Sequence, residues 1–315
     1  MNLPSPYLQL VIATIIWGGN FVVGRAIADQ LPPFSLTFFR WCTALLIFWP
    51  FCRKQIKAEK PIILANWWFI AVMALTGITG FNTLLYYALR YTTSINASLV
   101  FATSPIIISI LAAVILKERL TMYHFLGVGL TLGGVLYIIS NGSLSTLINF
   151  TFNLGDLMVI IAVISWGFYS IAVRSARQLP LFSSFAYSII FSLPLITLLF
   201  LWEMNWSDKV IVWSWASVAA ILYVGIMASI VAFILWNAAV SRLGPARSSI
   251  FLNLVPVFAS VFAILFNNET LAPYQLIGGL VVILGVYIST DTKKMKRIRR
   301  RWSGFRKGGD ALRKN

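Results

Sequence analysis

The sequence SLVFATSPIIISILAAVILKERLTMYHFLGVGLTLGGV, residues 98–135, decides the fold because a second copy follows it. Residues 249–286 read SIFLNLVPVFASVFAILFNNETLAPYQLIGGLVVILGV and align with the first copy without a gap. The identical pairs are Ser98/Ser249, Pro105/Pro256, Ser109/Ser260, Ala112/Ala263, Glu118/Glu269, Leu120/Leu271, Tyr123/Tyr274, Gly127/Gly278, Gly134/Gly285 and Val135/Val286. Apolar residues match easily by chance, so the proline, glutamate, tyrosine and glycine pairs carry the signal. An internal repeat within hydrophobic segments is typical of membrane transporters.

The composition is that of a chain surrounded by lipid. Of 315 residues, 59% are hydrophobic and 11% are charged, whereas a soluble domain has roughly 45–50% apolar and about 25% charged residues. Cys42 and Cys52 fall in one predicted helix and lie about 15 Å apart along it, too far for a disulfide. We therefore expect an all-α membrane protein in which both cysteines are apolar fillers.

A membrane-spanning helix needs about 20 predominantly apolar residues. Ten segments meet this requirement, and the breaks between them contain residues typical of loops, such as Pro32-Pro33 and Asn141-Gly142. The predicted spans are 7–28, 34–51, 67–89, 95–116, 123–140, 155–176, 182–202, 213–240, 247–266 and 273–290.

The distribution of positive charge sets the expected orientation, because cytoplasmic loops carry an excess of Lys and Arg. With ten spans, both termini lie on one side of the membrane. The loops on that side hold ten Lys and Arg before residue 291, whereas the opposite loops hold only Arg25, Arg90 and Lys209. We therefore expect a multi-pass protein of the inner (plasma) membrane whose N- and C-termini are both cytoplasmic.

The sequence divides into two halves and a tail. Residues 1–141 and 152–290 each contain five predicted spans, and an odd number of spans turns the second half upside down relative to the first. Trp17-Gly18 and Arg25 recur as Trp166-Gly167 and Arg174, which supports the duplication. Two inverted halves enclose a site near the midplane that can open to either side. Residues 291–315 form a basic cytoplasmic tail, which we expect to bind anionic lipid headgroups and not nucleic acid.

At this point the chain resembles the drug/metabolite transporter superfamily, in particular its EamA-like members, over about residues 7–290. The resemblance is specific for the fold and weak for the substrate. It implies ten helices in two inverted five-helix repeats around a central cavity, in a family that includes exporters of amino acids and other metabolites. The sequence departs from this pattern at residues 267–269, where the second copy lacks the basic neighbours of the glutamate. The residues that carry the resemblance are Trp17 to Phe21, Phe39 to Trp41, Ala88, Leu89, Pro105, Leu116 to Leu120, Gly127, Gly134, Gly155, Asp156, Trp166, Gly167, Pro256, Glu269 and Gly278.

Several polar and aromatic residues within the apolar spans are candidates for the wall of that cavity, because an unpaired polar group in hydrocarbon is costly. For most of them, hydrogen bonding or packing between helices is the open alternative. The candidates are Trp17, Asn20, Asn82, Tyr86, Trp166, Tyr169, Ser170, Trp236, Asn237 and Asn253. Pro105 and Pro256 are candidate hinges, because proline removes a backbone hydrogen bond and kinks a helix; a static bend is the alternative.

Three charged or titratable residues have competing interpretations. Arg40 lies within a span, where it can extend outward to the interface, hold carbonyls at helix ends or meet a carboxylate of the substrate. Glu118 and Glu269 are expected to cap the following helix or to pair with nearby basic groups. His124 is expected at the inner interface. Gly129 and Gly133 form a GxxxG pair that permits close packing but does not establish a dimer.

The functional prediction is a transporter of a small metabolite, such as an amino acid or related compound, that exports it by alternating access. The alternatives are a facilitator or flippase of an amphipathic or lipid-linked cargo, and a membrane sensor. No group of residues at ligand spacing suggests a metal, a cofactor or an enzyme active site. No Asp or Glu lies in the middle of a span, because Asp156 and Glu203 are at helix ends, so a proton relay has no evident carrier. The substrate, the direction, the ion coupling and the choice between monomer and homodimer stay open.

Overall fold

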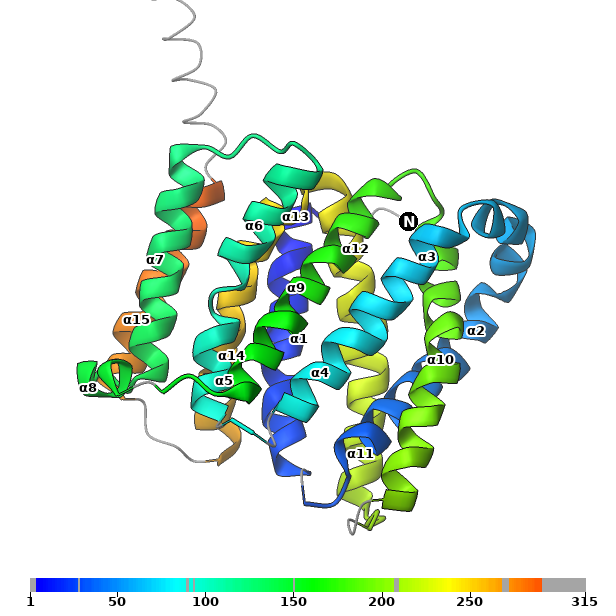
Figure 1. Cartoon of the computed structure of the whole chain (residues 1–315), viewed down its shortest axis with the longest axis horizontal. Helices are drawn as coiled ribbons and strands as arrows, with labels where there is room; N and C mark the ends of the chain where they lie inside the picture. Colours follow the sequence, from blue (N-terminus) through cyan, green and yellow to red (C-terminus); the bar gives the residue numbers. More distant parts are fainter. Residues whose placement is uncertain are drawn as a thin grey trace, which may run out of the picture.

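The structure is a computed structural model that describes residues 4–27, 29–88, 91–92, 94–149, 151–206, 210–267 and 272–290. All the regular structure in these ranges is helical (Figure 1), and ten of its segments are long and apolar enough to cross a membrane, which confirms the ten predicted spans. The elements are α1 (Pro6–Ala26), α2 (Pro33–Ala65), α3 (Trp67–Met73), η1 (Ala74–Gly80), α4 (Phe81–Ala88), α5 (Ser94–Phe101), α6 (Ser104–Ile115), α7 (Met122–Ile139), α8 (Leu144–Ile148), α9 (Leu154–Ser175), α10 (Leu181–Trp206), α11 (Trp215–Tyr223), η2 (Val224–Val231), α12 (Ala232–Leu243), α13 (Pro245–Ser249), η3 (Ile250–Asn253), α14 (Leu254–Asn267) and α15 (Pro273–Thr290).

The packing of α7 against α15 shows how the repeats are related. A Cβ atom on Gly127 would come within 2.7 Å of the Gly285 carbonyl oxygen, and one on Gly134 within 2.7 Å of the Gly278 carbonyl oxygen. Gly127 corresponds to Gly278 in the repeat, and Gly134 corresponds to Gly285. Exchanging the two repeats therefore converts each of these contacts into the other. Such reciprocal contacts are the mark of a two-fold relation. The helices are antiparallel, and the glycines let them approach closely.

The predicted GxxxG pair takes no part in this crossing. A Cβ atom on either Gly129 or Gly133 would meet nothing within 4 Å. Gly129 and Gly133 are exposed and lie on the outer face of α7, whereas Gly127 and Gly134 are buried and face α15.

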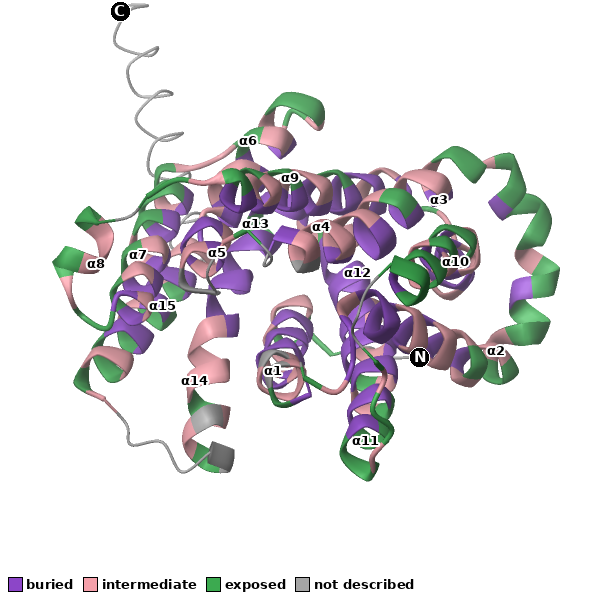
Figure 2. Cartoon of the chain, turned by 60° about the horizontal axis from the view of Figure 1, so that its bottom comes forward, coloured by how far each residue is buried: buried purple, intermediate pink, exposed green. Residues whose placement is uncertain are grey.

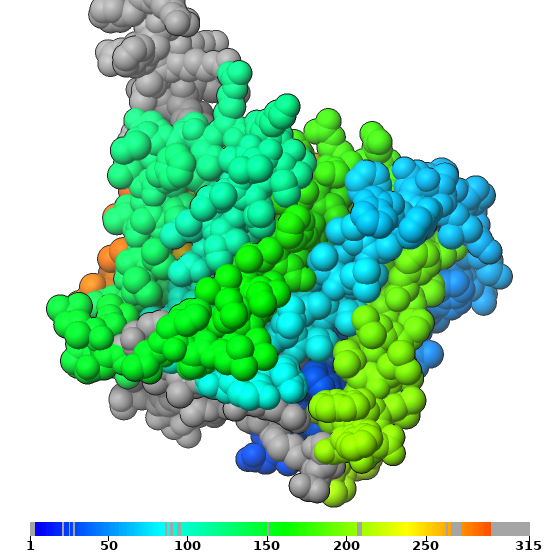
Figure 3. Space-filling model, in the orientation of Figure 1, coloured from blue at the N-terminus to red at the C-terminus, as the bar shows by residue number. Residues whose placement is uncertain are grey.

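The two repeats interlock. On the face shown in Figure 3, α9 of the second repeat (green) lies between α4 and α6 of the first. The equivalent helix of the first repeat, α1, packs against α12 and α14 of the second repeat. Each repeat therefore places its first helix among the third and fourth spans of the other. In Figure 1, α1 begins and α15 ends at the upper face.

The second predicted span ends at Phe51, but α2 continues to Ala65. Beyond the apolar run the helix is mostly exposed and stands apart from the bundle (Figure 2). Ile56 and Ile63, seven residues apart and therefore on one face, are fully buried. This amphipathic extension was not predicted, because the apolar run ends before it and Pro61 lies within it.

Two carboxylates, one toward each end of α2, add hydrogen bonds to the packing of α2 against α10. The N-cap of α2 is Pro32, which has no side-chain acceptor for the free amides of the first turn. Glu203 of α10, buried, supplies it: its carboxylate accepts the backbone N–H of Phe34 at 3.2 Å and of Ser35 at 2.7 Å. Toward the other end, the Ser183 hydroxyl of α10 donates to the carboxylate of Glu59 in the α2 extension.

Four spans are irregular, in two matching pairs. The third and eighth spans contain π-helical segments, η1 and η2, at corresponding places in the two repeats. The fourth span is broken between α5 and α6, and the ninth passes through the 3-10 segment η3 before α14. Pro105 and Pro256 lie in the first turns of α6 and α14. They begin new helices after a break, where the missing N–H is tolerated, and do not kink continuous helices as the sequence suggested.

Candidate functional site

Aromatic rings fill the centre of the bundle. Trp17 of α1 packs against Trp166 of α9, with ring centroids 5.7 Å apart, and against Trp236 of α12 at 5.5 Å. Phe233 of α12 lies 5.8 Å from Trp17 and 5.5 Å from Trp166. Tyr169 stacks on Trp166 at 4.9 Å. We call these five residues the aromatic cluster; all are buried.

The contact between Trp17 and Trp166 locates the centre of the molecule. These two residues correspond to each other in the repeat. In a two-fold arrangement, a residue touches its own counterpart only near the axis. The duplicated Trp-Gly motif therefore lies where the two repeats meet, and three further rings from the second repeat surround it.

The π-helical segments supply polar groups beside the cluster. A π-helix shifts the backbone hydrogen-bond register. In η2, the carbonyl of Ala228 accepts a hydrogen bond from the indole N–H of Trp17 at 3.1 Å and from Arg40 at 3.3 Å. In η1, the carbonyl of Thr76 accepts from Ser165 at 2.8 Å and that of Ala74 accepts from Ser192 at 3.1 Å. The first two spans of each repeat thus bind the π-segment of the other repeat.

Arg40 points into the bundle and not toward the interface. It is 4% exposed. Its Nε donates to the Ser229 hydroxyl at 2.5 Å and one terminal nitrogen donates to Asn82 Oδ1 at 3.4 Å. The guanidinium also lies 5.1 Å from the Trp41 ring centroid and 5.9 Å from that of Phe233, within cation–π range. Arg40 therefore joins α2 to α4 and η2, so the interpretation in which it extends outward is wrong.

A buried hydrogen bond joins Asn237 to Tyr169 of the aromatic cluster. The Tyr169 hydroxyl donates to Asn237 Oδ1 at 2.7 Å. The remaining Asn237 nitrogen has no hydrogen-bond partner among the described residues. Other buried polar atoms also have no hydrogen-bond partner in the described part of the chain. They include Nε1 of Trp41, Trp166 and Trp236 and the hydroxyl of Ser170.

The other predicted site residues lie in different environments. Asn20 is half-buried on α1, and its side chain makes no hydrogen bond within the described part of the chain. Asn82 donates to the Ile78 carbonyl at 3.0 Å, within its own span. Asn253 donates to the Thr131 hydroxyl of α7 at 3.0 Å, so it joins two helices away from the aromatic cluster. The side chain of Tyr86 lies outside the described residues, as do Glu269 and the tail.

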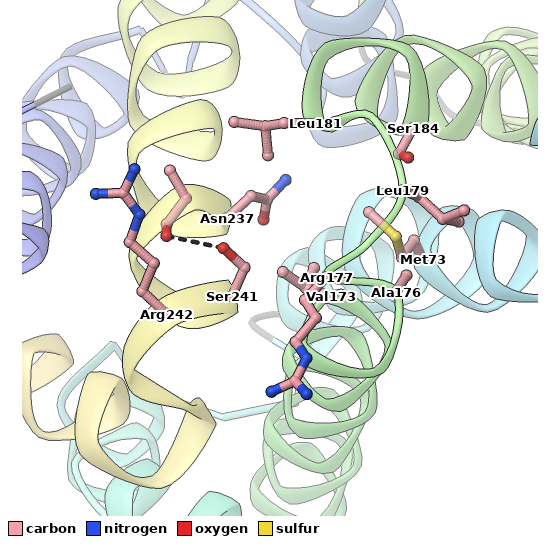
Figure 4. A pocket seen from close by; sticks show the side chains of 11 residues that line it. Met73, Val173, Ala176, Arg177, Leu179, Leu181, Ser184, Asn237, Ser241 and Arg242 are labelled. Atoms are coloured by element: carbon pink, nitrogen blue, oxygen red, sulfur yellow. Dashed lines mark hydrogen bonds between the residues drawn. The ribbon is translucent and has the colours of Figure 1, made fainter. Parts of the chain in front are cut away.

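A cavity of about 200 Å³ lies between this centre and the upper face of Figure 1, among α3, α9, α10 and α12. Asn237 lines it, and the exposed Arg177 and Arg242 lie at its rim (Figure 4). The cavity was not predicted, because it depends on how the ends of these four helices pack.

The family model of the EamA-like transporter family matches residues 4–140 and 153–290. The chain belongs to this family. The EamA-like fold also occurs in a solved crystal structure that is 19% identical, with a TM-score of 0.75 over 91% of this chain and 96% of that one.

Proteins named as transporters match the chain over nearly its whole length. An uncharacterized transporter of Archaeoglobus fulgidus is 29% identical over 90% of this chain and 96% of its own, and the uncharacterized transporter YyaM of Bacillus subtilis is 26% identical over 92% and 95%. A probable terminal-alkyne amino-acid exporter of Streptantibioticus cattleyicolor is 27% identical over 91% and 94%. The protein is therefore a multi-pass membrane transporter.

Two residues near the start of α7 make contacts that the sequence did not predict. His124, expected at the inner interface, lies in the first turn of α7 and is buried, 4% exposed; its Nε2 lies 2.8 Å from the Ser109 hydroxyl, so it joins α6 and α7. Thr121, not Glu118, caps α7: its hydroxyl accepts the backbone N–H of His124 at 3.3 Å.

Glu118 lies against the junction of α12 and α13, where the charges of Arg174 and Arg247 act on it, in agreement with the alternative of nearby basic groups. A Cβ atom on Gly244, which has φ +90°, would come within 2.9 Å of the Glu118 Cδ. Burial raises the pKa of the Glu118 carboxyl above its ordinary value of 4.5, and the charge of Arg174, the backbone N–H of Ala246 and the charge of Arg247 lower it in part. The folded state therefore binds the Glu118 proton more readily than the unfolded state does.

The pH dependence of stability tests this environment. A raised carboxyl pKa contributes stability that is present below pH 4.5 and is lost as the pH rises through the folded pKa. We expect Glu118→Gln, which stays neutral, to flatten the dependence of melting temperature on pH above 4.5. Thermal unfolding in detergent measures this, with Asp29→Asn, which removes an exposed carboxyl, as the control. An equally steep profile in Glu118→Gln would contradict the assignment.

Proposed function

We propose that the protein is an inner-membrane exporter of a small metabolite, an amino acid or a related compound. The substrate occupies a site at the aromatic cluster, which opens alternately to the two sides of the membrane. The first repeat comprises residues 1–141 and the second residues 152–290. The N- and C-termini and the tail 291–315 are cytoplasmic, so the upper face in Figure 1 is the inner face.

The observation that carries this proposal is the set of unpartnered donors around the axis. A buried donor without an acceptor costs about 1–3 kcal/mol. The indole nitrogens of Trp166 and Trp236 can only donate, and no described residue accepts from them. Flat aromatic surfaces together with free donors suit a small molecule that has an apolar body and acceptor oxygens. The amino-acid exporter among the relatives agrees with a substrate of this kind.

Matching irregular helices support the alternation between the two sides. The breaks before Pro105 and Pro256 and the π-segments η1 and η2 occur at corresponding places in two interlocked repeats. Exchange of the two repeat conformations converts an inward-open state into an outward-open one. We propose that the two prolines mark the hinges of this exchange.

Flux through liposomes tests the proposal. We expect purified protein to carry at least one member of a panel of labelled amino acids and metabolites with saturable kinetics. Trp166→Ala should reduce that flux about tenfold or more, because a lost hydrogen bond to the substrate is worth about 1.4 kcal/mol or more. Asn20→Ala should reduce it as well.

The matched control for this assay is Trp215→Ala, which removes an indole that is 89% exposed. It should leave the flux unchanged. Folded protein that carries nothing in the panel, or flux that is equal in Trp166→Ala and Trp215→Ala, would count against a transport site at the cluster.

A further inference from the structure

The cavity near the upper face has two buried side chains with free polar atoms. Asn237 is 1% exposed and its Nδ2 has no partner among the described residues. Ser184 of α10 is 5% exposed, and its hydroxyl likewise has no partner in the described part of the chain. Both residues line the cavity, from opposite walls (Figure 4).

The hydrogen bonds already made fix the character of this site. Because Asn237 Oδ1 accepts from Tyr169, the free end of the amide is the NH₂ group, a donor. The Ser241 hydroxyl in the wall donates to the Ala238 carbonyl at 2.9 Å. The buried groups that are left for a ligand are therefore one amide donor and one hydroxyl, which can donate or accept.

The charges around the cavity have one sign. Arg177, after α9, and Arg242, at the end of α12, line it, and no described lining residue is acidic. The N-terminus of α10 adds a partial positive charge, because Leu181 and Ser184 in its first turn are part of the wall. Cationic groups at the rim and a donor at the base favour an anionic ligand over an ammonium group.

We propose that this cavity is the inner loading subsite of the transporter and that it binds the carboxylate of a small metabolite. The inference rests on the proposed transport function and adds the chemical group that is recognised. Arg177 and Arg242 attract the carboxylate, and Asn237 Nδ2 and the Ser184 hydroxyl donate to it. The cavity measures about 200 Å³, smaller than the roughly 300–1,000 Å³ of sites for drug-sized ligands, so the ligand is of amino-acid size.

A chain of contacts connects this subsite to the centre. Asn237 holds the Tyr169 hydroxyl at 2.7 Å, and the Tyr169 ring stacks on Trp166, which touches Trp17. A carboxylate at Asn237 therefore lies one hydrogen bond from the aromatic cluster. The apolar part of the same molecule can then face the rings.

Matched probes test which group is recognised. Alanine, leucine and phenylalanine are each compared with two analogues. One is the amine that lacks the carboxylate, and the other is the carboxylic acid that lacks the amino group. The measurement is the rise in melting temperature of the detergent-purified full chain with increasing probe, which yields an affinity. We expect the amino acid and the acid of at least one set to bind, and the matching amine to bind about tenfold more weakly or not at all. Inorganic phosphate should bind more weakly than that acid.

Charge removal locates the site. Arg177→Gln combined with Arg242→Gln should weaken binding of the acid about tenfold. The control, Arg53→Gln combined with Arg119→Gln, removes two exposed positive charges elsewhere and should leave the affinity unchanged. Equal loss in both double variants would show that the arginines act only through net charge and would overturn the proposal.

Asn237→Asp reverses the chemistry at the base of the cavity. Aspartate keeps an acceptor for Tyr169 but replaces the NH₂ donor with an oxygen, so the acid should bind more weakly and the amine more tightly than to the wild type. Ser184→Ala is a smaller change that should weaken binding of the acid and leave binding of the amine unchanged. It replaces Asn237→Asp as the test if that variant does not fold. An unchanged ranking of the acid over the amine in Asn237→Asp, or an unchanged acid affinity in Ser184→Ala, overturns the assignment.

The same assays separate this inference from the proposed function. If amines bind as well as acids, or no acid binds, while flux that depends on Trp166 persists, the loading subsite is wrong and the transporter proposal stands. If no probe binds and nothing is carried, both proposals fail.

Discussion

Replacing Arg40 with lysine is expected to lower the free energy of unfolding by roughly 2–4 kcal/mol, more than replacing it with methionine does. The planar guanidinium reaches Ser229, Asn82 and the Ala228 carbonyl at once. The lysine ammonium is a single point and cannot span all three acceptors. Neutral hydrogen bonds between membrane helices average only about 0.6 kcal/mol. The hydrogen bonds of Arg40 have a charged donor and connect α2 to two other elements, so we expect a larger effect.

Methionine is the informative comparison. Placing a charge at the centre of a membrane helix costs about 2.5–3.5 kcal/mol on insertion scales. Methionine removes this cost together with the hydrogen bonds, whereas lysine keeps the cost and loses most of the bonds. Unfolding in detergent by denaturant or heat measures the order. Arg53→Lys, at an exposed position of the same helix, should change stability by less than about 0.5 kcal/mol. Lysine as stable as arginine at position 40 would contradict the network.

Gly77→Ala is expected to destabilise the protein by about 3 kcal/mol and to abolish most transport. A methyl group at this position of η1 would overlap the ring of Tyr169, coming within 2.6 Å of its Cε2. The ring has no room to retreat, because it is fully buried, stacks on Trp166 and donates to Asn237. The added carbon therefore displaces the side chain that connects the cavity to the aromatic cluster.

The control and the double variant make this result specific. Gly129→Ala adds the same methyl group to a helix where nothing lies within 4 Å, and alanine is favoured over glycine in a helix by about 1 kcal/mol. It should leave stability unchanged or raise it. Combining Gly77→Ala with Tyr169→Leu should cost less than the sum of the single changes, because the overlap is removed. Strict additivity would mean that the methyl group acts elsewhere.

The fold and the centre of the candidate site could be predicted from the sequence because both depend on duplicated residues. Ten apolar runs were enough to identify the spans, and the two Trp-Gly motifs identified Trp17 and Trp166, which meet at the axis. Tyr169 was predicted because it lies three residues after Trp166 and therefore on the same helix face, and Trp236 because it stands beside Asn237 in the eighth span. Ser229 was missed, although it is the only polar residue between Gly225 and Trp236 and could have been found by that criterion.

Other features could not be predicted because they depend on contacts between distant segments. A π-helical segment has no signature in a single sequence: Gly77 and Gly80 in η1 do not distinguish it from an ordinary helix. The cavity lined by Asn237 lies where the ends of α3, α9, α10 and α12 meet. Asn253 was a candidate because it lies three residues before Pro256, and only the packing shows that its side chain donates a hydrogen bond to Thr131 of α7.

The double attachment of α2 to α10 limits how the molecule can rearrange. The carboxylate of Glu203 accepts hydrogen bonds from the first turn of α2. The carboxylate of Glu59, near the far end of α2, accepts one from Ser183 in the first turn of α10. Neither helix can slide along the other or rotate about its own axis without breaking a contact to a carboxylate. We therefore expect the two helices to move as one rigid body, and any bending to occur in the irregular spans around them.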